Sequence, residues 1–564
     1  MLEFLIPPFV FFIAAALVPL VPMGRLRNII LLAAPLIAAT ILLHVGYGAF
    51  FPVTFYGLEM ELFRVDPLSR IFGLIFCIAA FLGNLYAAHL RDTVQQVAAL
   101  LYAGSAVGAV FAGDLVSLFF YWEGTAIASV FLIWARGTEG AYHTGVRYLL
   151  YQIGSGVVLI AGVVLYYFDT GSITFEAMTL GSLATWMILF AFGIKAAFPF
   201  LHNWMIESYP AATVTGTVIL SAFTTKLAIY VLARGFPGEE LLIYIGIVTV
   251  IFTVIYAQIE NDLRKLLAYS LNNQLGFMII GVGVGTELAL NGVATHAFVH
   301  ILYKALLFMA IGAVLFRTGT ARASDLGGLY RTMPWTTTFC LIGAASASAF
   351  PLFSAFASKS LILDGIAKEG LTWVWVAAMI GSIGVFAHAG IKLPYKAFFA
   401  EDSGKRPEEA PTTMLLAMGA TAALCMTIGF WPAGLYALAP FELDYEAFTT
   451  SHIIGQLQLL LFALMAFLVL YLSGLIPKDR PSLNFEFDWV TRKAGPKAVG
   501  WVAAIVSKIW GWFTGWINDT TRDAFNQMMF THGPEGRIAR QWPTGAMVLS
   551  IAILLALALL INFL

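Results

Sequence analysis

Charged residues are scarce in this chain of 564 residues, where Asp, Glu, Lys and Arg together make up only 11%. A typical soluble domain carries about 25% charged residues. Hydrophobic residues make up 60% of the chain, so a water-soluble fold would expose far too much apolar surface. The formal net charge of -1 gives no sign of nucleic-acid binding. The composition therefore predicts a protein that sits in a lipid bilayer and has no nucleic-acid partner.

Cysteine is equally scarce. Cys77, Cys340 and Cys425 stand alone within apolar runs, and the sequence contains no CxxC pair. That pattern excludes a disulfide framework and gives no basis for an iron–sulfur cluster or a zinc site. We therefore expect neither a cofactor nor a bound metal.

Long apolar runs are what the sequence has in abundance. A membrane helix needs about 20 mostly apolar residues, and by that rule the chain contains roughly 14 to 16 such segments. The opening run MLEFLIPPFVFFIAAALVPL lacks the basic start and cleavage site of a signal peptide, so we expect a first membrane helix there. The predicted fold is an all-α polytopic membrane protein. The predicted segments are 4–22, 28–50, 68–88, 97–113, 115–135, 146–168, 182–202, 213–234, 240–258, 267–284, 290–316, 334–366, 371–398, 412–436, 455–475 and 544–563.

Two of these regions contain prolines that should interrupt the helix. Pro199 lies in 182–202, and Pro351 and Pro394 lie in 334–398. A proline inside a membrane helix breaks its hydrogen-bond ladder, and transporters tolerate such breaks where they line an ion path. The tripeptide Gly-Ile-Lys precedes a proline in both regions, at 193–195 and at 390–392. These features predict two broken helices in corresponding positions.

The segment 477–543 differs from the rest, because it is rich in charged residues and tryptophan. Trp501, Trp510, Trp512 and Trp516 recur at roughly helical spacing together with Lys508. This pattern is typical of a helix that lies at the membrane interface. The sequence therefore predicts an interfacial helix within 499–517, followed by a final membrane helix at 544–563.

Charged side chains within the apolar runs are the main functional signal. Burying one at the bilayer centre costs roughly 2.5–3.5 kcal/mol on insertion scales. Glu123 lies in SLFFYWEGTAIASVFLIW, with apolar residues on both sides. A structural ion pair would explain it, but an intramembrane carboxylate is by default a functional residue. We interpret Glu123 as a proton carrier.

Two lysines occupy similar positions. Lys195 lies deep in MILFAFGIKAAFPFLHNW, and Lys226 lies mid-span in VILSAFTTKLAIYVLA. Desolvation makes a buried lysine easy to deprotonate, so it can load and release a proton near physiological pH. The structural alternatives are a side chain that reaches to the interface for Lys195, and a counter-charge to Glu207 or Glu123 for Lys226. We favour proton transfer for both.

Two histidines and a lysine form a stripe in ATHAFVHILYKALLFM. His296, His300 and Lys304 are spaced i, i+4, i+8, which places them along one face of a helix. Histidine titrates near neutrality, so the stripe is typical of a proton wire. A metal site would need a third ligand and a carboxylate behind it, whereas the third member here is a cation.

The segment FAHAGIKLPYKAFFAEDSGK holds the last candidates. Lys392 sits deeper than Lys396 and shares its tripeptide with Lys195, so we favour Lys392 as a carrier. Lys396 adjoins a polar tail and can reach the interface. Lys359 follows a proline-broken run, and its sequence context decides nothing. His388 has no evident partner in the sequence, which favours a structural role.

At these residues the sequence resembles a known family. The similarity spans about 65–400 and is carried, in order, by YWEGTA, GIKAAFPFLHNWM, SAFTTKLAIYVLAR, NDLRKLLAYSLNNQLGFM, HAFVHILYKALLFM and DLGGLYRTMP. These motifs are similar to those of the antiporter-like proton-translocating family. It includes subunits of Mrp-type multisubunit sodium/proton antiporters, of respiratory complex I and of membrane-bound hydrogenases. KLPYKAFFA and GPEGRIARQWPTG are most similar to the D-type proteins of Mrp antiporters.

The resemblance implies a core of 14 helices with two inverted five-helix repeats, each with one broken helix. It implies that Glu123 pairs with Lys195, that Lys226 bridges to the stripe, and that Lys392 is the second broken-helix residue, with Lys396 as its competitor. It also implies other membrane subunits as partners, and protons and sodium as the transported ions. The expected divisions are N-terminal helices 1–96, repeats 97–235 and 236–400, C-terminal helices 401–476, an interfacial extension 477–543 and a final helix 544–564.

The resulting hypothesis is a proton-translocating subunit of a multisubunit sodium/proton antiporter in the cell membrane. Protons would pass along the axis from Glu123 and Lys195 through Lys226 and the stripe to Lys392. Three alternatives stay open. The first is a proton-pumping subunit of a redox complex, and this is the one alternative in which the chain would be part of an enzyme. The second is a membrane subunit of a proton-driven inorganic carbon transporter. The third is a scaffold whose charges only hold helices together.

Overall fold

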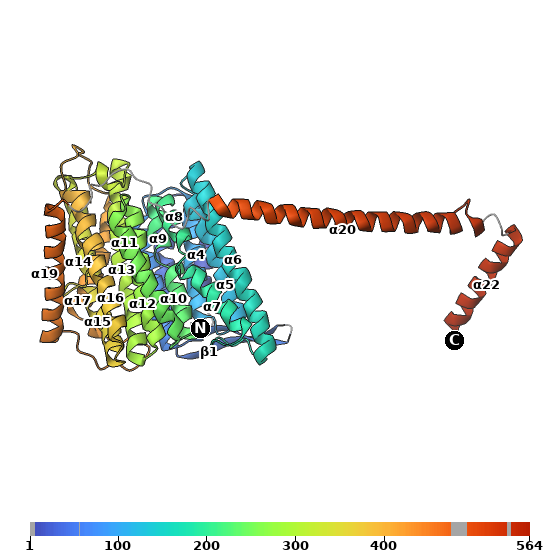
Figure 1. Ribbon diagram of the computed structural model, residues 1–564, viewed down its shortest axis with the longest axis horizontal. Helices are drawn as coiled ribbons and strands as arrows, with labels where there is room; N and C mark the ends of the chain where they lie inside the picture. The colour runs from blue at the N-terminus through green and yellow to red at the C-terminus, as the bar shows by residue number, and fades with distance from the viewer. Residues whose placement is uncertain (1–5, 56, 475–492, 539–542, 564) are drawn as a thin grey trace. The chain divides into compact units, whose positions relative to one another are not determined.

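The computed structural model describes residues 6–55, 57–474, 493–538 and 543–563. Within these residues, twelve helices are long and apolar enough to cross a membrane, and two shorter apolar helices accompany them. The chain is therefore a multi-pass membrane protein built almost wholly of helices, as the composition predicted. It divides into two compact units, Met1–Asn484 and Phe485–Leu564. In the first unit the helices stand side by side (Figure 1).

The N-terminal part of the first unit contains three helices and a β-hairpin. These elements are α1 (Pro7–Leu17), α2 (Arg25–His44), β1 (Gly48–Phe55), β2 (Leu58–Val65) and α3 (Pro67–Tyr86).

The hairpin is a departure from the all-α prediction. The sequence predicted a helix over 28–50, whereas α2 ends at His44 and the paired strands follow. Hydropathy alone does not separate an apolar strand from a buried helix, and β1 is rich in aromatic and β-branched residues. The hairpin is anchored to the turn after α4, because the amide of Gly113 donates to the carbonyl of Glu61 at 2.9 Å. The amide of Glu61 in turn donates to the Asp114 carboxylate at 2.9 Å.

Seven helices follow before residue 236. They are α4 (Thr93–Phe111), α5 (Leu115–Trp134), α6 (Glu139–Thr170), α7 (Leu183–Lys195), α8 (Asn203–Ala211), α9 (Val214–Leu220) and α10 (Thr224–Gly235).

A second series of the same kind occupies the next part of the chain. It contains α11 (Glu240–Ile259), α12 (Leu263–Val284), α13 (Glu287–Thr318), α14 (Pro334–Ala347), α15 (Ser354–Lys368), α16 (Thr372–Val385) and two π-helical segments, η5 (Phe386–Lys392) and η6 (Tyr395–Phe399).

The two series match at their long helices and at the loops beyond them. The long helices α6 and α13 are both 32 residues long and begin 148 residues apart, at Glu139 and Glu287. Each is capped at its N-terminus by a threonine side chain and ends at a left-handed glycine. The aspartates that cap α5 and α12 are also 148 residues apart. Each forms an isolated bridge to the loop beyond the long helix, Asp114 to Thr174 and Asp262 to Arg322.

The two breaks match as well. Between α7 and α8 the backbone is left-handed at Ala197 (φ 57°) and Phe200 (φ 70°), and between α14 and α15 it is left-handed at Ala349 (φ 54°) and Leu352 (φ 73°). Such values are uncommon outside glycine, so their recurrence at the same spacing marks one shared local structure. The Gly-Ile-Lys tripeptides do not mark it. The second break lies at 348–353, ahead of Lys392, and the shared signal is the Ala-Phe-Pro of 197–199 and 349–351.

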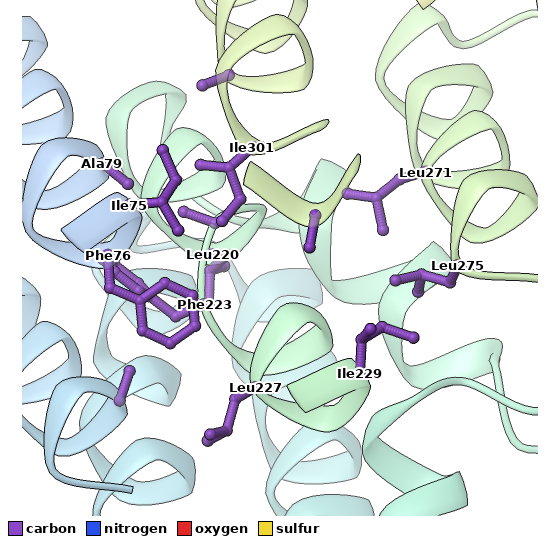
Figure 2. Packing of buried hydrophobic residues seen from close by; sticks show 14 of the residues in the cluster. Ile75, Phe76, Ala79, Leu220, Phe223, Leu227, Ile229, Leu271, Leu275 and Ile301 are labelled. Carbon is purple, nitrogen blue, oxygen red and sulfur yellow. The ribbon is translucent and has the colours of Figure 1, made fainter. Parts of the chain in front are cut away.

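A third interruption separates α9 from α10 at 221–223. Apolar side chains from several helices pack around it, as Figure 2 shows. They come from α3, from α9 and α10, from α12 and from α13, so this packing holds the two series together. The labelled members are Ile75, Phe76, Ala79, Leu220, Phe223, Leu227, Ile229, Leu271, Leu275 and Ile301.

The first unit ends with α17 (Thr412–Phe430), α18 (Ala433–Tyr436) and α19 (Thr450–Leu472). The second unit contains α20 (Gly495–His532) and α22 (Thr544–Phe563). The predicted interfacial helix is thus part of a longer helix, whose four tryptophans are exposed within their unit. Residues 477–492 and 539–542 of the predicted extension lie outside the described residues, as do the end of the predicted helix 455–475 and the start of the predicted first helix.

Candidate functional site

Lys195 is the last residue of α7, directly before the first break, and its side chain is fully buried. Its ammonium donates to the Trp122 carbonyl at 2.6 Å and to the Thr125 hydroxyl at 2.9 Å. It also lies 4.2 Å from the centroid of the Trp122 ring. All three contacts come from α5, so the break turns the end of α7 toward that helix. A cation whose hydrogen bonds go to neutral groups can change its protonation without breaking an ion pair.

Glu123 lies on the same helix, α5, and is half-buried. Its carboxylate interacts electrostatically with Lys195, but within the described residues the two form no ion pair at 4.0 Å or less, and Oε1 of Glu123 has no hydrogen-bond partner there. The carboxylate instead lies over Gly156 of α6, so that a Cβ at Gly156 would stand 1.5 Å from Oε1. The pairing implied by the resemblance is therefore open in this structure, with both members in place.

Lys226 lies in the first turn of α10, just after the interruption at 221–223, and is fully buried. Its ammonium donates to the carbonyl of Ser221 at 2.6 Å and to the hydroxyl of Thr225 at 3.2 Å. The carbonyl is available because the interruption frees it from the helical ladder. Glu207, one of its possible counter-charges, is paired with Arg147 at 2.7 Å.

The three residues of the stripe lie on α13 and are completely buried. His296 contacts the Ser358 hydroxyl at 2.9 Å through Nδ1 and the Gln274 amide oxygen at 3.1 Å through Nε2. The rings of His296 and His300 have centroids 5.9 Å apart. Lys304 donates to the hydroxyl of Ser270 at 2.5 Å. The predicted alignment on one helix face is thus present, and α12 and α15 supply its polar contacts.

His300, on α13, is influenced by charges from both series. Neither of its ring nitrogens has a hydrogen-bond partner in the described part of the chain. The charges that act on it most strongly are those of Lys226, from the first series, and Lys304, from the second. A buried imidazole with both nitrogens unengaged retains a donor and an acceptor for proton exchange.

Lys392 is the last residue of the π-helical segment η5 and is nearly fully buried. Its ammonium donates to the carbonyls of Gln258 and Glu260 at 2.7 and 2.8 Å, which lie at the C-terminal end of α11. A lysine is favoured there by the partial negative charge of a helix C-terminus. Lys396, its competitor, lies on η6 and is less buried. Lys392 thus stands near one end of the helix layer, where α11 stops.

Lys359 is a candidate that the sequence left undecided. It lies on α15 just beyond the second break, and only 2% of it is exposed. Its ammonium lies 3.2 Å from the Ala347 carbonyl at the end of α14 and 3.4 Å from the Ser382 hydroxyl. Ser358, next to it in sequence, contacts His296. The repeated Ala-Phe-Pro would have pointed to Lys359, because it identifies the break that positions this lysine.

The arrangement is therefore a buried series of titratable groups that crosses both halves of the first unit. Within the described residues, no three His, Cys, Asp or Glu side chains lie close enough together to hold a metal ion. The chemistry that the series supports is proton transfer between lysine, histidine and carboxylate groups.

Comparison with known proteins agrees with this geometry. The family model of the NADH:quinone oxidoreductase/Mrp antiporter transmembrane region matches residues 112–384. The chain is 30% identical to a D-type Na(+)/H(+) antiporter protein of Alkalihalophilus pseudofirmus over 57% of its own length and 70% of that protein. It is 26% identical to hydrogenase-4 component B of Escherichia coli over 65% of its length and 62% of that protein.

A solved structure shows the same fold. A chain of the Mrp complex from Dietzia sp. superposes with a TM-score of 0.76 at 24% identity, covering 92% of this chain and 62% of the other. The chain spans between 41% and 70% of the length of the first curated relatives.

Proposed function

Since this chain belongs to the NADH:quinone oxidoreductase/Mrp antiporter transmembrane family, we propose that it is the proton-translocating subunit of a multisubunit cation/proton antiporter. The observation that carries the proposal is the buried series of lysines and histidines. Its members lie on helices of both halves, from Lys195 on α7 to Lys392 on η5. A scaffold would need its charges paired, whereas Lys195, Lys226, Lys304 and Lys359 are bound by carbonyls and hydroxyls.

The switch in this mechanism is the distance between Glu123 and Lys195. Two unit charges 4 Å apart interact by about 4 kcal/mol at an effective dielectric constant of about 20. If the Lys195 ammonium moves from the Trp122 carbonyl toward Glu123, the proton affinity of Lys195 therefore changes by orders of magnitude. We propose that this change is passed on to Lys226, whose charge acts on His300 of the stripe.

Beyond the stripe, the proton has two acceptors. Lys359 is reached through the contact of His296 with Ser358, and Lys392 stands at the end of α11. We place both on the path, with Lys392 as the group nearer the membrane surface. Lys396 is left outside it.

We propose sodium as the exchanged cation and other membrane subunits as the partners. The support is the 30% identity to a protein whose name describes a component of a Na(+)/H(+) antiporter, together with the fold shared with a chain of an Mrp complex. We also propose that 97–235 and 236–400 act as two repeats, each with its own broken helix, and that α20 lies along the membrane surface. The matching offsets of α6 and α13 support the first of these.

Glu123→Ala and Lys195→Ala are expected to abolish transport while leaving assembly intact. The measurement is the cation-dependent pH change in everted vesicles that carry the complete complex, with the chain quantified in the same membranes. Lys368→Ala removes an exposed lysine near the end of α15 and serves as the control for loss of charge. Wild-type pH changes in either axis variant, at equal abundance, would refute the proposal.

The redox alternative has one observation in its favour, the match to hydrogenase-4 component B. In that case the same axis would be driven by electron transfer in partner subunits. Purification from native membranes separates the two functions. Co-purifying iron–sulfur subunits would indicate the redox complex, and further membrane subunits without redox centres would indicate the antiporter.

A further inference from the structure

The π-helical segment η5 is the most unusual backbone feature near the axis. It follows α16 without a turn and spans Phe386–Lys392, which is longer than the single-turn bulges that most π-helices form. π-helices are rare and occur frequently at functional sites, because the widened turn redirects side chains. Two titratable residues, His388 and Lys392, lie on this one segment.

His388 is completely buried on η5. Neither of its ring nitrogens has a hydrogen-bond partner in the described part of the chain. Buried polar groups are normally hydrogen-bonded, and an exception calls for an explanation. A structural histidine would use at least one nitrogen to hold a neighbouring element, and His388 holds none among the described residues.

The charged groups that act on His388 come from three elements. They are Lys304 on α13, Lys392 on η5 and Lys359 on α15. The segment is also seated on the second break, because a Cβ at Gly390 would stand 2.3 Å from the Ser348 hydroxyl. This close approach fixes the π-helix against the start of the turn that leads to Lys359. His388 therefore shares a π-helical segment with Lys392, and that segment is packed against the second break.

We propose that His388 is a further proton carrier, which connects Lys304 and Lys359 to Lys392. The inference rests on the proposed function and names a member of its path. A lysine ammonium gives a proton to one ring nitrogen of the neutral imidazole and becomes an amine. The imidazolium then releases the proton of its other nitrogen to the amine of Lys392, which becomes an ammonium. The imidazole is left in its other tautomer, and turning the ring restores the starting state.

The test uses the complete complex in everted vesicles and begins with His388→Gln. Glutamine fills most of the space and forms hydrogen bonds but does not carry a proton. We expect an initial rate of proton transport reduced about a hundredfold, the order of magnitude attached to loss of a proton-transferring group. We also expect a changed pH profile of the remaining rate. His143→Gln is the matched control, because His143 is an exposed residue at the start of α6.

A second variant separates proton transfer from a structural role. His388→Ala leaves a space for added imidazole, so imidazole should restore transport in His388→Ala and not in His388→Gln. Loss of transport with an unchanged pH profile and without rescue by imidazole would overturn the proposal. So would wild-type rates in both variants. If both His388 variants transport at wild-type rates while Lys195→Ala does not transport, the role of His388 is refuted and the proposed function stands. If Lys195→Ala also transports protons, the proposed function itself is refuted.

Discussion

Glu123 and Gly156 face each other across α5 and α6 at the start of the proton path. The carboxylate occupies the space that any side chain at 156 would fill. It is the far end of a flexible side chain, so a substitution at 156 displaces it without forcing the helices apart. The position of the carboxylate relative to Lys195 is thus set by the absence of a side chain on the neighbouring helix.

Gly156→Ala is therefore expected to lower the initial rate of proton transport by about tenfold, the equivalent of roughly 1.4 kcal/mol in the coupling between Glu123 and Lys195. The chain should still accumulate in the membrane. Gly154→Ala is the control, because a Cβ at Gly154 meets no atom within 4 Å. Equal transport rates in the two variants would show that the carboxylate does not need its observed position.

The residues of the path differ in how far the sequence could predict them. Glu123, Lys195, Lys226 and Lys304 stood out because a charge in an apolar run has few explanations. The open distance between Glu123 and Lys195 was beyond the sequence, because it depends on how α5, α6 and α7 pack. The surroundings of His388 were hidden for the same reason. The lysines that act on it lie on α13, on α15 and on a π-helical turn that no residue pattern predicts.

The broken helices are the elements on which the lysines depend. Ala197 and Ala349 both adopt left-handed backbone conformations, which cost a residue other than glycine roughly 1–2 kcal/mol. At both breaks an amide reaches back five residues, from Phe198 to the Gly193 carbonyl at 3.0 Å and from Phe350 to the Ala345 carbonyl at 3.1 Å. The same strained turn thus occurs at both breaks. Its recurrence indicates that the orientation it gives to the following residues offsets its conformational free energy.

Valine at either position is expected to lower the free energy of unfolding by about 1–3 kcal/mol, because a β-branched residue tolerates positive φ poorly. Ala197→Gly and Ala349→Gly should be close to neutral, since relief of strain offsets the added chain entropy. Thermal unfolding in detergent measures the order of stability of the valine, alanine and glycine variants. Ala423→Gly, in the middle of α17, is expected to destabilise by about 0.5–1 kcal/mol. If valine were as stable as alanine at 197, the left-handed turn would not be under strain.

At the scale of elements, the sequence predicted the helices well because about 20 apolar residues have one main solution in a membrane. It predicted interrupted helices from proline, but it assigned the second one to the wrong place. Two Gly-Ile-Lys tripeptides drew attention to Lys392, whereas the left-handed turns recur at the Ala-Phe-Pro segments. The β-hairpin at 48–65 was missed, because a short apolar run does not reveal its period.

At the scale of the whole first unit, Arg264 ties the two series together. It lies in the first turn of α12 and is almost fully buried. Its guanidinium donates to the carbonyls of Tyr209, Pro210 and Ala212 at 3.1, 2.9 and 3.1 Å, and it also contacts the Thr217 hydroxyl. These carbonyls end α8, the helix that follows the first break. One side chain of the second series therefore fixes the broken helix of the first.

Arg264→Met is expected to lower the free energy of unfolding by about 1–3 kcal/mol, because the buried carbonyl of Ala212 is left without a donor. Transport should fall further than this loss of stability alone explains, since α8 would no longer hold the end of the turn that follows Lys195. Lys265→Met removes the neighbouring, less buried cation and is the control. Both quantities are measured on the same membranes, as unfolding temperature and as initial rate of proton transport. If Arg264→Met and Lys265→Met have the same unfolding temperature and the same initial rate of proton transport, the two halves are coupled only through their apolar packing.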